Sequence, residues 1–190
     1  MSKFMYNMRN KHYGFIILAP SHNHGLIQST MYSIKRECKV KIPCLCVVGD
    51  DAQSSVIENI ETMCPVAQGG KTITSLMNTG LTNPPADWNV IIFEGSQIEA
   101  RSINKLFYFA RNHKDILYPI VIDYDRDGRP VNIFYEFHKG TLNGLTIHKD
   151  TFNQVGRFSD NPIAISKMFW QMDAIEMGCD FRAVLGAKMI

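Results

Sequence analysis

Short apolar runs alternate with stretches of helical periodicity along the first two thirds of the chain. Apolar runs bounded by Gly, Pro or polar residues predict buried strands, and apolar residues that recur every three or four positions predict helices packed on a sheet. The predicted strands are residues 14–20, 42–48, 65–66 and 88–93, and the predicted helices are residues 26–39, 54–63, 72–81 and 98–112. This alternation predicts a three-layer α/β/α fold with a mostly parallel sheet.

The last third of the chain has a different pattern. Two predicted strands, residues 116–122 and 131–137, are joined by a segment that ends in Asp127 and Gly128, a pair typical of a hairpin turn. A strand over 142–147, helices over 149–155 and 163–177, and a strand over 181–185 complete the chain. We therefore expect an antiparallel addition to the sheet. Because no linker or repeat interrupts the pattern, we expect residues 1–13 to be an N-terminal extension and residues 14–190 to form one domain.

The composition is that of an ordinary globular protein. The chain has 190 residues, of which 45% are hydrophobic and 20% charged, and a formal net charge of +2. Binding to a nucleic-acid backbone needs a far more basic balance, so we expect no nucleic-acid partner. No apolar run approaches the roughly 20 residues of a membrane-spanning helix. We expect no membrane span and a cytoplasmic location, which for a viral protein would be the host cytoplasm or the virion.

The five cysteines indicate neither a disulfide framework nor a structural zinc site. They are odd in number, and no two have the C-x-x-C spacing. We therefore expect mostly buried thiols. His22 and His24 with Cys44 and Cys46 offer a zinc site as the less favoured alternative, because the sequence does not place these four residues together.

Polar residues follow three of the predicted strands, at the edge where open α/β sheets bind their ligands. Asp50 and Asp51 can accept hydrogen bonds from a base or a ribose, and Asn23 can both donate and accept them. Glu94 can bind a divalent cation together with phosphate oxygens. The alternative for Asp50 and Asp51 is capping of the next helix, and for Asn23 it is an ordinary turn.

The order of these segments resembles the family 2 glycosyltransferases, which have the GT-A fold. The strand and loop over residues 15–23, with Pro20 and Asn23, look like the opening of that family, and the acidic loop over residues 47–55 looks like its base-binding loop. Three later segments resemble further motifs of the family in the same order. They are Gly70 with the helix that contains Asn78 and Gly80, residues 144–158, and residues 174–181.

The resemblance implies a GT-A-like domain that transfers a sugar from a nucleotide-diphosphate sugar to an acceptor, which the sequence does not identify. The residues implied to hold the nucleotide are Pro20, Asn23, Asp50, Asp51 and Asn78. The implied metal is Mn²⁺ or Mg²⁺ at the leaving diphosphate, and its position, Asp-x-Asp in the family, contains Glu94 and Ser96 here. The Asp that serves inverting members as general base has no counterpart near Ser166 and Lys167; Asp160 and Asp173 are the nearest carboxylates, and Asp160 is the candidate base.

These departures from the family leave a second interpretation open. A chain without the second metal carboxylate and the usual base can keep the sheet and lose the chemistry. It would then be a catalytically inactive module with a protein partner, a structural or interaction subunit of a larger assembly such as a virion. Ten Met and eleven Phe residues are compatible with an interface, although such residues more often form the core.

Two other motifs match known ligand loops only in part. The segment Asp123–Asp127 has the spacing of an EF-hand calcium loop, but Phe134 stands where a bidentate Glu is required. Lys71 follows two glycines, yet Pro65 stands where a P-loop needs its first glycine. We predict a hairpin turn at the first segment and no nucleoside-triphosphatase site at the second.

Overall fold

The structure, a computed structural model, describes residues 12–38, 42–119, 121–124, 127, 129–134 and 142–184. The strands of its main sheet are β1 (Tyr13–Ala19), β2 (Cys44–Gly49), β3 (Val66–Gly69), β4 (Trp88–Phe93), β5 (Asp115–Pro119), β8 (Thr146–His148) and β9 (Asp180–Val184). The helices are α2 (His24–Cys38), α3 (Ser54–Glu61), α4 (Ile73–Thr82), α5 (Ala100–Phe109), α6 (Lys149–Val155) and α7 (Ile163–Glu176).

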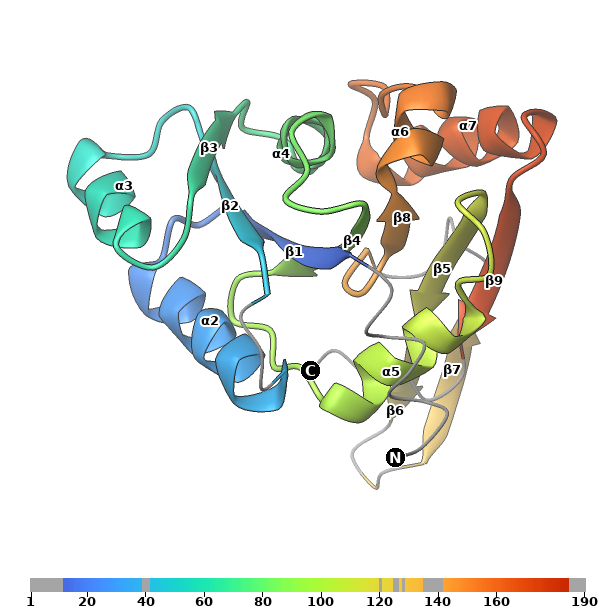
Figure 1. The fold of residues 1–190 in the computed structure, drawn as a ribbon, viewed down its shortest axis with the longest axis horizontal. Helices are drawn as coiled ribbons and strands as arrows, with labels where there is room; N and C mark the ends of the chain where they lie inside the picture. The colour runs from blue at the N-terminus through green and yellow to red at the C-terminus, as the bar shows by residue number, and fades with distance from the viewer. Residues whose placement is uncertain are drawn as a thin grey trace.

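The fold has three layers, with one sheet between two layers of helices. The sheet has seven strands in the order β3-β2-β1-β4-β8-β5-β9. Helices α2, α3 and α5 cover one face, and α4, α6 and α7 cover the other (Figure 1). The predicted α/β/α architecture with a mostly parallel sheet is confirmed.

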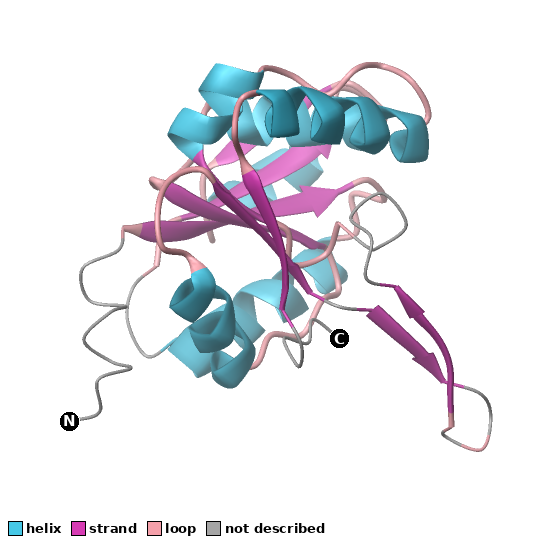
Figure 2. Cartoon of the chain, turned by 90° about the vertical axis from the view of Figure 1, so that its right-hand side faces the viewer, coloured by secondary structure: helices cyan, strands magenta, loops and turns pink. Residues whose placement is uncertain are grey.

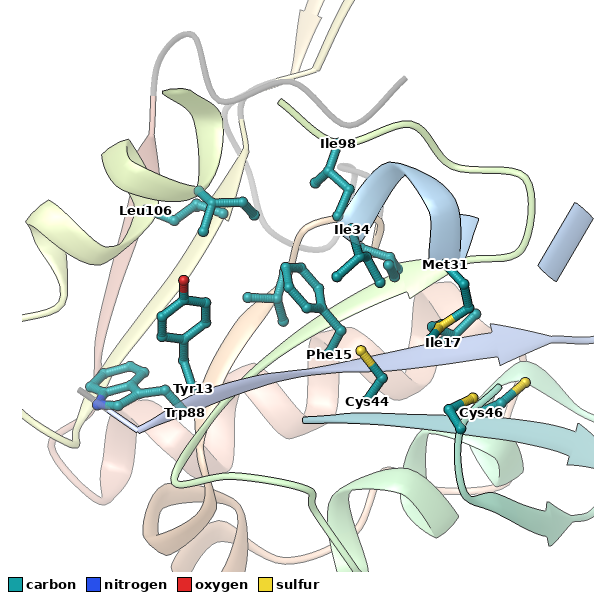
Figure 3. Packing of buried hydrophobic residues seen from close by; sticks show 14 of the residues in the cluster. Tyr13, Phe15, Ile17, Met31, Ile34, Cys44, Cys46, Trp88, Ile98 and Leu106 are labelled. Carbon is teal, nitrogen blue, oxygen red and sulfur yellow. The ribbon is translucent and has the colours of Figure 1, made fainter. Parts of the chain in front are cut away.

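The central strand β1 is buried on both faces of the sheet, as its apolar sequence predicts. All seven of its residues are buried, as the uninterrupted apolar run predicts for a strand covered on both faces. Phe15 and Ile17 face Met31 and Ile34 of α2 (Figure 3), and Ile16 points to the opposite face. Alternate side chains of one strand thus enter two separate cores.

The predicted antiparallel addition is present in two places. Strand β8 pairs antiparallel with both β4 and β5, with Trp88 opposite His148 and Leu117 opposite Thr146. Strands β6 (Val121–Tyr124) and β7 (Pro130–Phe134) form a separate hairpin that projects away from the main sheet (Figure 2). Asp125 and Gly128 of the predicted hairpin turn lie outside the described residues.

Several predicted boundaries differ from the structure. The strand predicted over residues 116–122 corresponds to two strands, β5, which ends at Pro119, and β6, which begins at Val121. The strand predicted to begin at Leu142 begins at Thr146, because Leu145 N donates to the Leu142 carbonyl in a turn. The helix predicted over residues 98–112 is shorter, since the backbone at Ala110 is already extended.

The remaining boundaries shift by a few residues. The first strand begins at Tyr13, inside the predicted N-terminal extension, and the first helix begins at His24. The strand predicted over residues 65–66 is β3. Among the described residues, no helix has both the length and the apolar character needed to cross a bilayer.

The cysteines are free thiols, as predicted. Four are buried and Cys38 is half-buried. Burial raises the pKa of Cys44 to about 12 and that of Cys38 to about 11. These thiols are therefore protonated and unreactive at neutral pH.

Candidate functional site

Strands β1, β2, β3 and β4 are parallel, so the loops that follow them meet at one edge of the sheet. This is the edge at which open α/β sheets bind ligands. The polar or exposed residues at this edge are Pro20 and Asn23 after β1, Asp50 and Asp51 after β2, Lys71 after β3 and Glu94 after β4. The structure therefore brings five of the predicted site residues into one group of loops.

Hydrogen bonds to the Glu94 side chain connect the loop after β4 to the loop after β1. Ser21 N donates to Glu94 Oε1 at 2.6 Å, and Asn23 N donates to Glu94 Oε2 at 3.1 Å. Hydrogen bonds to an ionised acceptor are stronger than those between neutral groups. The Glu94 carboxylate thus fixes the backbone of the residues that follow β1.

Asn23 has a structural role in the same loop. Its Oδ1 accepts a hydrogen bond from Leu26 N at 3.2 Å, so Asn23 caps the N-terminus of α2. Pro20 precedes it in an exposed turn closed by His22 N, which donates to the Ala19 carbonyl at 3.3 Å. The prediction that Pro20 and Asn23 bind a nucleotide stays a prediction.

Asp51 joins the loops after β1, β2 and β3. Its Oδ2 lies 3.3 Å from Lys71 Nζ, and its Oδ1 lies 3.6 Å from His22 Nε2. The hydrogen bond from Lys71 is the largest cause that holds the pKa of Asp51 below its usual value. Asp50 is the exposed neighbour of Asp51 in the same turn. With Glu94, this edge therefore carries three carboxylates and the Lys71 ammonium group.

Gly49 makes this contact between loops possible. Its N–H donates to His22 Nε2 at 3.1 Å, which places the proton of neutral His22 on Nδ1. A Cβ on Gly49 would lie 2.7 Å from Asp51 Oδ1 and 2.9 Å from His22 Nε2. Any other residue at position 49 would push the His22 and Asp51 side chains out of their present positions.

The position predicted to bind a metal is occupied by structural hydrogen bonds. Both oxygens of Glu94 accept backbone N–H groups, and the buried Ser96 lies with its Oγ 3.2 Å from Asn143 Oδ1. In the part of the chain that the structure describes, no three His, Cys, Asp or Glu side chains are grouped so that they could hold a metal ion. The role of Glu94 and Ser96 as metal ligands stays a prediction, and the zinc alternative at His22, His24, Cys44 and Cys46 is not supported.

Asn78 and Asp160 lie together, but apart from the loops of the sheet edge. Both termini of the Asn78 side-chain amide bind the backbone of Phe158. Asp160 lines a cavity of about 340 Å³ whose other lining residues belong to α4, to its end at Asn83 and to Arg157. No residue from the loops after β1, β2 or β4 lines this cavity. The nucleotide role of Asn78 and the base role of Asp160 stay predictions.

Three residues of this region were not predicted. Because the sequence around Lys71 does not match a P-loop, the sequence analysis gives this residue no role in the site. A Lys after two glycines at a strand end is nevertheless a usable signal. His22 was weighed only as a zinc ligand. Asn143 accepts hydrogen bonds from Phe93 N and Ser96 Oγ, both at 3.2 Å, and no local pattern indicates such a contact across 50 residues.

The fold matches solved structures of nucleotide-sugar enzymes. One is described as GalNAc-T7 with UDP, GalNAc and Mn²⁺; the match has a TM-score of 0.66, 8% identity, and covers 93% of this chain and 43% of that chain. Another is CMP:2-keto-3-deoxy-manno-octonic acid synthetase with CTP, at a TM-score of 0.56, 10% identity, and 93% and 90% coverage. The chain has a GT-A-like fold, that of the nucleotide-diphospho-sugar transferases.

Comparison of the sequence with protein families and with curated proteins identifies no family for the chain. No protein-family model matches the chain, and no curated protein matches it. The chain spans 43% of the length of the GalNAc-T7 chain. The similarity therefore establishes the fold, and the function has to be argued from the residues at the sheet edge.

Proposed function

We propose that the protein binds a nucleotide-diphosphate sugar at the edge formed by the loops after β1, β2, β3 and β4, and transfers the sugar to an acceptor. The observation that carries this proposal is the pair of contacts from Gly49 N–H to His22 and from Lys71 to Asp51, which join three of these loops at the edge where open α/β sheets bind ligands. The ligands of the two solved neighbours, UDP with GalNAc and Mn²⁺ in one and CTP in the other, support a nucleotide as the ligand.

Each side chain at the edge has a chemical role in this proposal. Asp50 and Asp51 accept hydrogen bonds from the base or ribose of the donor. Pro20 and Asn23 form the wall of the site, held in place by Glu94. Lys71 donates charge-assisted hydrogen bonds to the diphosphate, whose negative charge it partly neutralises.

The transfer step is a displacement at the anomeric carbon. The acceptor hydroxyl oxygen forms a bond to that carbon, the bond to the diphosphate oxygen breaks, and the hydroxyl proton passes to a base. Asp160 is our candidate for that base; because its cavity is lined by no residue of the loops after β1, β2 or β4, this role requires the Asp160 loop and the acceptor to come within hydrogen-bond reach of the donor. Lys71 is our candidate to neutralise the charge of the departing diphosphate, since both Glu94 oxygens already accept backbone hydrogen bonds.

Calorimetric titration with UDP, GDP, CTP and UDP-sugars, each with and without Mn²⁺, tests the proposal. We expect binding of at least one nucleotide, and about tenfold weaker binding by Lys71→Ala, because a hydrogen bond between charged groups is lost. Lys35→Ala, a change at an exposed lysine of α2, is the matched control and should leave the affinity unchanged. Failure to bind any of these ligands would contradict the proposal.

A second candidate function is a catalytically inactive GT-A module. The observation that favours it is the use of both Glu94 oxygens and the Ser96 hydroxyl in structural hydrogen bonds at the position where the family binds its metal. Donor hydrolysis or transfer that is lost in Asp160→Asn would support the enzyme. Nucleotide binding without any turnover, with or without Mn²⁺, would support the inactive module.

A further inference from the structure

Helix α7 presents an apolar stripe to solvent. The stripe consists of Ile165, Met168, Phe169, Met172 and Ile175, whose exposed fractions range from 41% to 55%. Their spacing of three and four residues places them on one side of the helix. Large apolar side chains gathered in this way mark an interaction surface more often than scattered ones do.

The stripe is not the side by which α7 packs on its own domain. The opposite side carries Ser166, Lys167, Trp170 and Ala174, all of which are buried. Trp170 stacks on Phe158 with ring centroids 4.6 Å apart. Helix α7, which lies in the layer formed by α4, α6 and α7 (Figure 1), is thus anchored by one side, and the stripe on its other side is exposed.

The spacing of the stripe suits a second helix of the same kind. Ile165, Met168, Met172 and Ile175 follow the alternating steps of three and four residues that bring helices together in pairs. Five side chains, each about half exposed, leave roughly 500 Å² of apolar surface on each chain. Two copies of the stripe would together bury about 1,000 Å², the area at which specific interfaces begin.

The charges on α7 select the orientation of the two helices. The exposed charged residues of α7 are Asp173 and Glu176, both near its C-terminus. Its N-terminus has no acidic residue in the first turn and no side-chain cap at Pro162. In an antiparallel pair each acidic end meets the partner's uncapped, positive N-terminus, whereas a parallel pair brings the acidic ends together.

We infer that α7 is the contact surface of a homodimer in which the two α7 helices pack antiparallel about a twofold axis. The same stripe serves both chains, so the contact closes at two copies. A membrane surface fits less well, because helices that lie on bilayers carry Lys and Arg beside the apolar side, and the exposed charges here are acidic. This inference is independent of the proposed transferase activity.

Sedimentation velocity of the full chain over a range of concentrations tests the inference. The wild type should be dimeric, and Met172→Glu should raise the dissociation constant of the dimer about 100-fold or more, because two unpaired carboxylates would enter an apolar contact. The control Tyr32→Glu puts the same charge at a residue of α2 that is 69% exposed and should leave the dimer intact. A wild-type monomer at every concentration, or a Met172→Glu dimer of wild-type affinity, would overturn the inference.

Cross-linking tests the orientation. In a Cys38→Ser background, chains with Ile165→Cys should cross-link to chains with Ile175→Cys in a mixture, while neither variant should cross-link to itself. The reverse result, with each variant linked only to itself, would show a parallel pair and overturn the antiparallel arrangement. Circular dichroism of each variant checks that the fold is retained.

Discussion

Asn78 and Phe158 are joined by two hydrogen bonds across 80 residues of sequence. Asn78 Nδ2 donates to the Phe158 carbonyl at 2.8 Å, and Phe158 N donates to Asn78 Oδ1 at 2.9 Å. One side chain of α4 thus satisfies both backbone groups of a residue in the loop between α6 and α7. These two hydrogen bonds connect the loop between α6 and α7 to helix α4.

Replacing Asn78 by Ala should lower the free energy of unfolding by about 2–3 kcal/mol. The substitution leaves the buried N–H and carbonyl of Phe158 without partners, and each such group costs more than the net value of its hydrogen bond. Urea unfolding measures the loss. The control Asn153→Ala, at an exposed position of α6, should change stability by less than about 0.5 kcal/mol. Equal effects of the two substitutions would contradict this assignment.

Glu94→Gln should destabilise the protein by about 1–2 kcal/mol and weaken nucleotide binding. The amide can still accept one of the N–H groups of Ser21 and Asn23, but its NH₂ then faces the other. Urea unfolding and calorimetric titration follow the two effects. Glu99→Gln is the matched control, because Glu99 makes no side-chain capping bond. If Glu94→Gln were as stable as this control, Glu94 would not hold the loop.

Gly80→Ala should cost about 1–3 kcal/mol even though Ala is the better helix former. A Cβ at position 80 would lie 2.5 Å from Ile16 Cγ2 and 3.2 Å from Val47 Cγ2, so α4 would have to move away from the sheet. Gly25→Ala in α2 is the control; there the nearest atom lies at 3.4 Å. Thermal unfolding should show a lower midpoint for the first variant and an equal or higher one for the second.

His148 should make stability fall in mild acid. Its Nδ1 accepts a hydrogen bond from Asp150 N at 3.2 Å and caps α6. Burial is the largest cause that lowers the pKa of His148, against the raising effects of Asp150 and Asp87; His113 and Lys149 lower it further. Because the folded pKa lies below the unfolded one, the unfolded chain takes up the proton first as pH falls. The contribution of neutral His148 to the free energy of unfolding is therefore complete above about pH 6.5 and is lost as the pH falls below that value.

His148→Asn separates this pH effect from the cap itself. Asn keeps a capping oxygen but does not titrate, so the drop in unfolding free energy between about pH 8 and about pH 5 should be smaller by about 1 kcal/mol in the variant. Urea unfolding at the two pH values gives the difference. Titrating groups that do not interact with His148 are common to both proteins and cancel. An identical drop in the two proteins would show that His148 has no such role.

The strand and helix pattern could be predicted because it depends on local residues. Every residue of β1 is buried, and the apolar run from Phe15 to Ala19 predicts such a strand, covered on both faces. The order of the loops at the sheet edge followed from the same alternation. The start of β8 was harder, because it depends on a turn at Gly144, which has a φ of 92°.

The contacts that define the candidate site could not be predicted in the same way. Asp51 meets Lys71 and His22 only when three loops assemble, and Glu94 meets the backbone of Ser21 across 73 residues. A backbone N–H has no signature in the sequence. The same residue type, Glu or Asp, can therefore either hold a loop or bind a metal, and only the structure distinguishes the two roles.

The position of β8 between β4 and β5 affects how the chain is made. Strand β4 is complete at Phe93, but the strand that covers its open edge ends only at His148. At roughly 5–20 residues per second, the ribosome leaves that edge unpaired for about 3–10 s. An unpaired apolar edge is a template for pairing with other chains. Slow codons that delay the emergence of residues 146–148 from the ribosome would lengthen this interval and lower the soluble yield.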